Sequence, residues 1–131
     1  MTLSYKIDPM RRLITLTVAG VVTEHDIRTT DRALLSEPGY DRDFDHLVDG
    51  REGRRLIGSA DVLRELAARS SVNAGVRRAL VTGNLLTYGL ARLFQAAHDA
   101  HGLPDEVRIF RNIDEARAWL AAPRAGDRKS A

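Results

Sequence analysis

The first twenty residues contain two short runs in which apolar and polar side chains alternate. The first run covers residues 3–8, and the second covers residues 13–19 with the sequence LITLTVA. Alternation with a period of two is typical of β-strands. A turn that contains Pro9 separates the two runs, and Gly20 follows the second. We therefore predict an antiparallel hairpin whose second strand ends at Gly20.

The spacing of apolar residues then changes to that of a helix. Thr23 precedes this segment and Asp26 lies three residues later, a pair typical of the first turn of a helix. A Pro-Gly pair at residues 38–39 cannot continue a helix. We predict a first helix that begins after Thr23 and ends before this pair.

The middle of the chain predicts a short strand, a loop and a second helix. Residues 46–49 (HLVD) form the strand, and residues 50–58 are polar enough to be expected as a loop. Three basic residues lie in this segment: Arg51, Arg54 and Arg55. Ser59 is the expected N-cap of the next helix. The inner face of that helix is formed by Val62, Leu63, Leu66 and Ala67.

Residues 77–100 are the most informative part of the chain. An apolar run at residues 77–81 predicts a strand, and the turn at residues 82–84 leads into a helical pattern that ends near His101. One face of this helix carries Leu86, Leu90, Leu93, Phe94 and Ala97. A fifth strand at residues 107–110 and a last helix at residues 113–121 follow.

The order of the elements predicts an α/β protein of one domain. A hairpin followed by alternating helices and strands gives a mixed five-stranded sheet flanked by helices, because crossover connections join parallel strands. A length of 131 residues fits a single domain. We expect this domain to cover residues 1–121 and a polar tail to cover residues 122–131.

Three segments resemble those of a known family. They read YKID at residues 5–8, LVD at residues 47–49 and YGLARLF at residues 88–94. Together with the order of elements, they resemble STAS domains, the fold of the sporulation anti-sigma-factor antagonists. The closer similarity is to the small bacterial SpoIIAA-like (STAS/CRAL-TRIO-like) proteins, over most of residues 3–121. Most of these proteins have no assigned biochemical function, so the resemblance implies a fold more than an activity.

The resemblance also implies a role for Ser59. In phosphorylatable STAS proteins, a serine at the start of the helix after the third strand accepts the phosphate, usually next to an aspartate. Ser59 lies at the similar position, but Gly58 precedes it and the loop before it is longer. Ser59 is therefore either a plain helix cap or a phosphoacceptor whose added charge would alter a binding surface.

Composition narrows the class of protein further. The net charge is only +2, which does not favour binding to nucleic acid. There is no cysteine, so disulfides, thiolate metal sites and cysteine nucleophiles are excluded. The N-terminus does not resemble a signal peptide, and no apolar run is long enough to span a membrane. We expect a cytoplasmic protein without a cofactor.

Several polar residues are weak candidates for chemistry. The arginines of residues 50–58 precede a helix and would suit an anion. His98 and His101 lie three residues apart on a helix, but two histidines without a third ligand do not define a metal site. Asp49 ends the short third strand, and a hydrolase using Asp49 and Ser59 would lack an identifiable base. We therefore predict neither a metal site nor an enzyme.

The helix at residues 85–100 carries more apolar surface than one contact with a sheet requires. Leu85 and Tyr88 lie outside its main apolar face, so they are either exposed together or line a pocket. The first prediction is a non-enzymatic regulatory or interaction module that forms a homodimer through this helix. The alternative is a carrier or sensor of a small apolar ligand, such as a lipid or fatty acid, bound between sheet and helices. The candidate contact residues are Arg54, Arg55, Ser59, Leu85, Tyr88 and Arg92.

Overall fold

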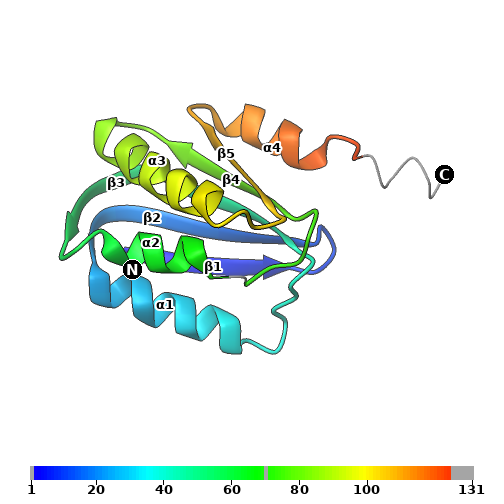
Figure 1. Ribbon diagram of the computed structural model, residues 1–131, viewed down its shortest axis with the longest axis horizontal. Helices are drawn as coiled ribbons and strands as arrows, with labels where there is room; N and C mark the ends of the chain where they lie inside the picture. The colour runs from blue at the N-terminus through cyan, green and yellow to red at the C-terminus, as the bar shows by residue number, and fades with distance from the viewer. Residues whose placement is uncertain (1, 70, 125–131) are drawn as a thin grey trace.

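The computed structural model describes residues 2–69 and 71–124. Within them, one five-stranded sheet has the order β1-β2-β3-β4-β5. β1 is antiparallel to β2, and all other neighbouring strands are parallel. The strands are β1 (Leu3–Asp8), β2 (Leu13–Thr23), β3 (Asp45–Ile57), β4 (Arg77–Thr82) and β5 (Glu106–Phe110). This confirms the predicted α/β class with a mixed sheet (Figure 1).

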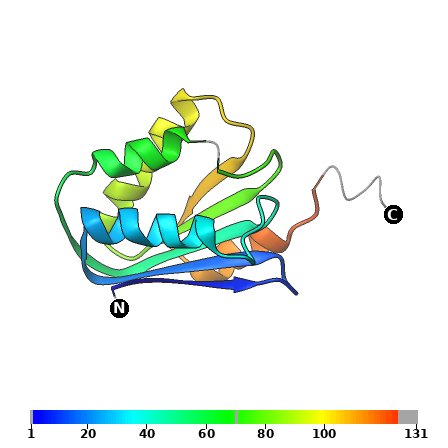
Figure 2. The same ribbon diagram turned by 90° about the horizontal axis from the view of Figure 1, so that it is seen from below.

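The helices cover the two faces of the sheet unequally. They are α1 (Glu24–Ser36), α2 (Asp61–Ala68), α3 (Leu85–Ala100) and α4 (Ile113–Ala121). Figure 2 shows α1, α2 and α3 on one side of the sheet and α4 on the other. We call the first side the three-helix face. No helix of the described residues is long and apolar enough to cross a membrane.

Three helices begin at side chains that cap their first backbone N–H groups. Thr23 and Asp26 form a capping box at α1, as predicted, and Asn84 with Thr87 forms another at α3. Asn112 caps α4 by accepting from two backbone N–H groups. These caps fix where each helix starts relative to the strand before it.

The start of α2 differs from the prediction. Its N-cap residue is Ala60, whose side chain makes no capping bond, so the prediction that Ser59 occupies this position is wrong by one residue. The Ser59 hydroxyl still accepts a hydrogen bond from the backbone N–H of Asp61, at 3.1 Å. The backbone of Ala60 is already helical, which moves the cap position past the serine.

β2 and β3 are longer than predicted. The expectations that β2 ends at Gly20 and that residues 50–58 form a loop are both wrong, because the two strands remain paired as far as Thr23 and Ile57. Two register shifts interrupt this pairing, and Gly20 has a φ of +64°, which glycine adopts without strain. The arginines expected in a loop therefore project from a strand: Arg51, Arg54 and Arg55.

The side of the sheet under α4 is closely packed. Leu47 of β3 and two residues of β4 form a fully buried cluster there with Ala116 of α4. Phe110 and Trp119 pack against this cluster, with their ring centroids 5.6 Å apart.

A smaller cluster on the three-helix face joins β2, α1 and the segment after it, through Ile14, Leu34 and Phe44.

The residues after α4 bind back to the domain as far as the structure describes them. The guanidinium of Arg77 donates hydrogen bonds to the carbonyls of Trp119, at 2.6 Å, and Ala122, at 2.9 Å. Arg124 pairs with Asp45 and donates to the carbonyl of Gly75. Residues 125–131 of the predicted tail lie outside the described residues.

Candidate functional site

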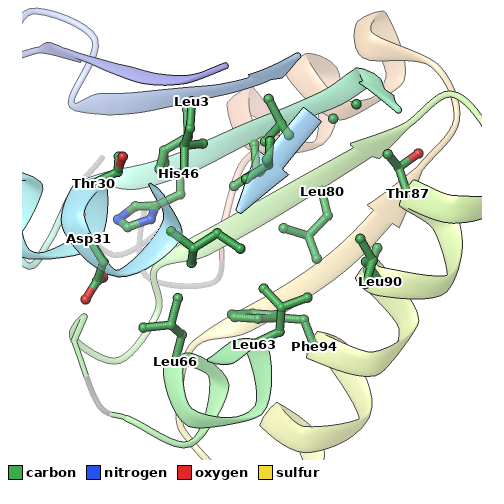
Figure 3. Close-up of a pocket in the computed structure, with 18 of the residues that line it drawn as sticks. Leu3, Thr30, Asp31, His46, Leu63, Leu66, Leu80, Thr87, Leu90 and Phe94 are labelled. Atoms are coloured by element: carbon green, nitrogen blue, oxygen red, sulfur yellow. The ribbon is translucent and has the colours of Figure 1, made fainter. Parts of the chain in front are cut away.

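A cavity of about 250 Å³ lies on the three-helix face, between the sheet and the helices that cover it (Figure 3). Residues of β2, β3 and β4 form its floor, and residues of α1, α2 and α3 form its walls. Ligand pockets are commonly concave, largely apolar spaces of this kind. The cavity is therefore the strongest candidate for a functional site among the described residues.

The register of the parallel strands determines what lies on the cavity floor. Alternate residues of a strand face the same side, and parallel neighbours lie beside each other. The floor residues of β3 and β4 therefore form three rows: His46 with Arg78, Val48 with Leu80, and Gly50 with Thr82. The cavity is polar at the first row and apolar along the second.

The walls of the cavity are mostly leucine and other apolar side chains. Figure 3 shows Leu63 and Leu66 of α2 and Leu90 and Phe94 of α3 facing the sheet around the space. Because α2 and α3 lie against each other, these side chains form a continuous apolar wall. Water finds no hydrogen-bond partners on such a surface, so the surface favours an apolar occupant.

His46 and Arg78 are the buried ionisable residues of the floor. They are register partners on β3 and β4, and each is less than 8% exposed. The Arg78 guanidinium carbon lies 5.4 Å from the ring centroid of Phe94, which lines the cavity. Two buried polar residues therefore meet at one end of an otherwise apolar space.

Arg78 belongs to a buried ionic network behind the cavity floor. Its Nε donates to Oδ2 of Asp105 at 2.8 Å, and Nε2 of His98 lies 2.9 Å from Oδ1 of the same carboxylate. Burial alone would raise the pKa of Asp105, but the hydrogen bond from His98 and the charge of Arg78 outweigh it and lower that pKa. Asp105 is therefore held as a carboxylate.

His46 is uncharged at neutral pH. Burial, reinforced by the positive charge of Arg78, lowers the pKa of His46 from 6.5 to about 3, although Asp105 acts in the opposite direction. Within the described residues, Nε2 of His46 is buried and has no hydrogen-bond partner. A neutral imidazole nitrogen in this position can donate or accept one hydrogen bond, depending on its tautomer.

Most other polar groups at the cavity already have partners. The Tyr40 hydroxyl donates to the carbonyl of Ser71 at 2.6 Å, and Thr82 donates to the carbonyl of Phe110. Thr87 is occupied by the capping bonds at the start of α3. The unused hydrogen-bonding capacity is therefore concentrated at the first row of the floor.

The opposite end of the cavity lies where β3 passes under the start of α3. Nδ2 of Asn84 donates to the carbonyl of Gly53 at 2.8 Å. A β-carbon at Gly53 would lie 3.0 Å from a methyl group of Thr87, so the strand and helix approach closely here. Beyond this contact, two exposed residues line the cavity: Arg54 and Arg55.

The structure places the six predicted contact residues at different sites. Arg54 and Arg55 line the cavity, and Arg54 also pairs with Glu52. The other four do not line it. Leu85 is 90% exposed, Ser59 is exposed before α2, and Tyr88 lies within 6 Å of the guanidinium groups of Arg92 and Arg111.

The weaker candidates are tied up in structural contacts. Arg51 forms a two-pronged ion pair with Asp49, at 2.9 and 2.8 Å, which lowers the pKa of that carboxyl. Buried His98 binds Asp105, whereas exposed His101 lies near the carbonyl of Ala97. In the part of the chain that the structure describes, no group of three or more possible metal ligands occurs.

Sequence reasoning did not connect His46 with Arg78. They are 32 positions apart, and each is a polar residue placed at the start of an apolar run, before LV and ALV respectively. That position was the available signal, since a polar residue in a buried strand requires a partner. Only the strand register shows that the two residues are neighbours.

Comparison with known proteins agrees with this architecture. A model of the SpoIIAA-like family matches residues 13–121. The chain is also similar to the crystal structure of an uncharacterized protein from the DUF3478 family with a SpoIIAA-like fold, from Shewanella loihica PV-4. The two are 17% identical with a TM-score of 0.59, over 91% of this chain and 92% of the other, a likeness that shows the fold alone. No curated protein matches the chain.

Proposed function

The chain belongs to the SpoIIAA-like family, and we propose that it binds a small apolar ligand in the cavity, as a carrier or a sensor. The observation that carries this proposal is the space of about 250 Å³ under α1, α2 and α3. Natural protein interiors are close-packed, and voids much larger than a water molecule are few. This cavity instead separates the leucines of α2 and α3 from the sheet.

The energetic cost of leaving such a space empty supports the same conclusion. At about 24 cal/mol per Å³, the cost would be at most on the order of 6 kcal/mol, the value for a fully enclosed space of this volume. That is comparable to the whole stability of many domains, about 5–15 kcal/mol. An apolar occupant would recover part of this energy by filling the space.

A neutral ligand tests the proposal without any assumption about its polar groups. We expect 1-octanol to bind the purified full chain in isothermal titration calorimetry, with a negative heat-capacity change from apolar burial. Native mass spectrometry of freshly purified protein should also show a bound apolar molecule. No binding of 1-octanol at millimolar concentration, and no co-purified molecule, would contradict the proposal.

Two alanines of α3 provide a matched pair of variants. Ala91 is buried and lines the cavity, whereas Ala96 is exposed on the same helix. Ala91→Phe should fill the space and weaken 1-octanol binding at least tenfold, while Ala96→Phe should leave it unchanged. Equal affinities of the two variants would show that the ligand binds elsewhere.

A second candidate function is protein interaction, through a homodimer that uses the start of α3. Leu85 is 90% exposed, and an apolar side chain of this size on a helix surface suits a partner surface. Tyr88, Arg92 and Arg111 lie beside one another there. Light scattering at high micromolar concentration tests this role: a dimer that Leu85→Glu converts to a monomer supports it, and a wild-type monomer contradicts it.

Regulation through Ser59 would fit either function. Its exposed hydroxyl lies beside the first turn of α2, where added negative charge would be favoured by the free backbone N–H groups. Mass spectrometry of the protein from its own host tests this. A phosphate on Ser59 supports a switch, and an unmodified chain under all growth conditions counts against one.

A further inference from the structure

We propose that the ligand has a carboxyl head and a single apolar chain, and that the carboxyl group lies between His46 and Arg78. This inference rests on the proposed function, since it assigns the chemistry of the occupant of the same cavity. The sequence alone indicated Arg54, Arg55 and Tyr88 as candidate contact residues. The structure assigns the head instead to the first row of the floor, under the helices.

The unused hydrogen-bonding atoms carry this inference. In the described part of the chain, three buried polar atoms lack a hydrogen-bond partner: Nε2 of His46, Nη2 of Arg78 and Nδ1 of His98. The first two belong to residues that line the cavity. Nη2 of Arg78 forms an ion pair with Oδ2 of Asp105 at 2.8 Å but makes no hydrogen bond to it. A buried donor without an acceptor is costly, so an acceptor supplied by a ligand stabilises the complex.

The chemistry of these two atoms selects the head group. Arginine has only donors, so the ligand must present an acceptor to Nη2. Neutral His46 can donate through Nε2 to the second oxygen of the same group. A carboxylate offers two acceptor oxygens in one plane and forms strong charge-assisted bonds to arginine. An amine head has no acceptor when protonated, so it cannot satisfy Nη2.

Because of the ionic network behind the floor, Arg78 can bind the carboxylate of a ligand in addition to that of Asp105. Asp105 is bound through Nε of Arg78 and also through His98, so two groups share its charge. The guanidinium is fixed against Phe94 and β4, which reduces the entropy lost when a ligand binds. Arg78 is therefore oriented before the ligand arrives.

The size of the cavity limits the apolar chain. At roughly 30 Å³ for each water-sized group, 250 Å³ accommodates about eight such groups, close to the nine or ten non-hydrogen atoms of 1-octanol and octanoate. From the row of His46 to the row of Gly50, the floor extends four residues, or about 13 Å. A medium-chain acid fits this length, with its tail over Val48 and Leu80 and its end toward Arg54 and Arg55.

Three ligands that differ only in their heads test the inference: octanoate, 1-octanol and octylamine. Isothermal titration calorimetry at pH 7 should give octanoate at least a tenfold lower Kd than 1-octanol, and octylamine the highest Kd. His46→Leu should reduce the ratio of the 1-octanol Kd to the octanoate Kd at least threefold. Arg78→Lys keeps the charge beside Asp105 but removes Nη2, and should reduce the ratio further.

A wall residue serves as the matched control. Leu63 lines the cavity through an apolar side chain, so Leu63→Val should weaken both ligands alike and leave the ratio unchanged. If 1-octanol binds but octanoate binds no more tightly, the carboxyl assignment is overturned while the proposed function stands. If neither binds, the proposed function itself fails. Should Arg78→Lys not fold, the ratio measured with His46→Leu decides.

Discussion

His46 makes the stability of the fold depend on pH. Its pKa is about 3 in the folded protein, against an ordinary value of 6.5. Between these values the unfolded chain binds the additional proton, so the free energy of unfolding decreases as pH falls below 6.5. From pH 7 to pH 5 this single group should lower stability by about 2 kcal/mol.

His46→Leu removes this contribution, and urea unfolding at the two pH values measures it. We expect the variant to lose about 2 kcal/mol less than the wild type between pH 7 and pH 5. Other titrating groups act in both proteins and cancel in the comparison. An equal loss in the two proteins would mean that the buried imidazole becomes protonated at little cost.

At the scale of residues, local chemistry was predictable and cross-strand chemistry was not. The cap at Thr23 follows from two residues that lie three positions apart, Thr23 and Asp26, so the sequence identified it. The meeting of His46 with Arg78 depends on the alignment of two parallel strands joined by a helix, which no local pattern encodes. The prediction for Ser59 was wrong by one position, because the backbone of Ala60 is already helical and Ala60 is the N-cap of α2.

The close contact between α3 and the extended part of β3 depends on Gly83. A β-carbon there would lie 2.7 Å from the carbonyl oxygen of Arg51 and 2.9 Å from its Cα, both backbone atoms that cannot move alone. Gly83→Ala should therefore push the helix away from the strand and lower the free energy of unfolding by about 1–3 kcal/mol.

Gly89 provides the opposite case within α3. No atom lies within 4 Å of a β-carbon built on it, and glycine in a helix is about 1 kcal/mol less favourable than alanine. Gly89→Ala should therefore raise the urea midpoint while Gly83→Ala lowers it. Changes of the same sign in both variants would contradict the close packing of α3 on β3.

Two ion pairs connect α1 and α2 above the cavity. Arg28 contacts Glu65 at 2.7 Å, and Arg69, just after α2, contacts Asp31 at 2.7 Å. Both pairs are partly exposed, so each contributes only about 0.2–1 kcal/mol. α2 packs far more extensively against α3 than against α1, so α1 and α2 are held together less tightly than α2 and α3.

Ligand release should therefore become faster when these pairs are removed. We expect the double variant Glu65→Gln, Asp31→Asn to increase the dissociation rate of a bound apolar probe roughly threefold to tenfold in stopped-flow measurements. Arg64→Gln is the matched control, because Arg64 pairs with Asp61 within α2. Equal release rates from the double variant and the wild type would place the exit elsewhere.

The helices were predictable as elements, whereas the full lengths of β2 and β3 were not. Amphipathic spacing and flanking Gly and Pro residues define a helix from within its own sequence. The ends of β2 and β3 lie beyond β4, which stops at Thr82, so their side chains need no apolar pattern. Their pairing is made by backbone groups, which nearly all residue types share, so it leaves little trace in the sequence pattern.

Across the whole molecule, the two faces of the sheet are filled differently. Under α4, Leu47, Ala79, Val81 and Ala116 pack together with almost no exposure. On the three-helix face, three residues of the main apolar face of α3 line the cavity: Leu86, Leu90 and Phe94. Leu85 instead points to the surface. The pattern of α3 predicted apolar surface beyond its main face, at Leu85 and Tyr88, but it did not show that the main face itself borders a cavity.

Enlarging one alanine on each face should reveal this difference. Ala79 is fully buried in the packed cluster, so Ala79→Leu should overpack it and lower the free energy of unfolding by about 1–3 kcal/mol. Ala91 borders the cavity, so Ala91→Leu extends into open space and should keep or raise stability in urea unfolding. Equal destabilisation by both would mean that the helices close onto the sheet in solution. If Ala91→Leu alone retains or raises stability and also weakens binding of 1-octanol, the ligand binds in the cavity on the three-helix face.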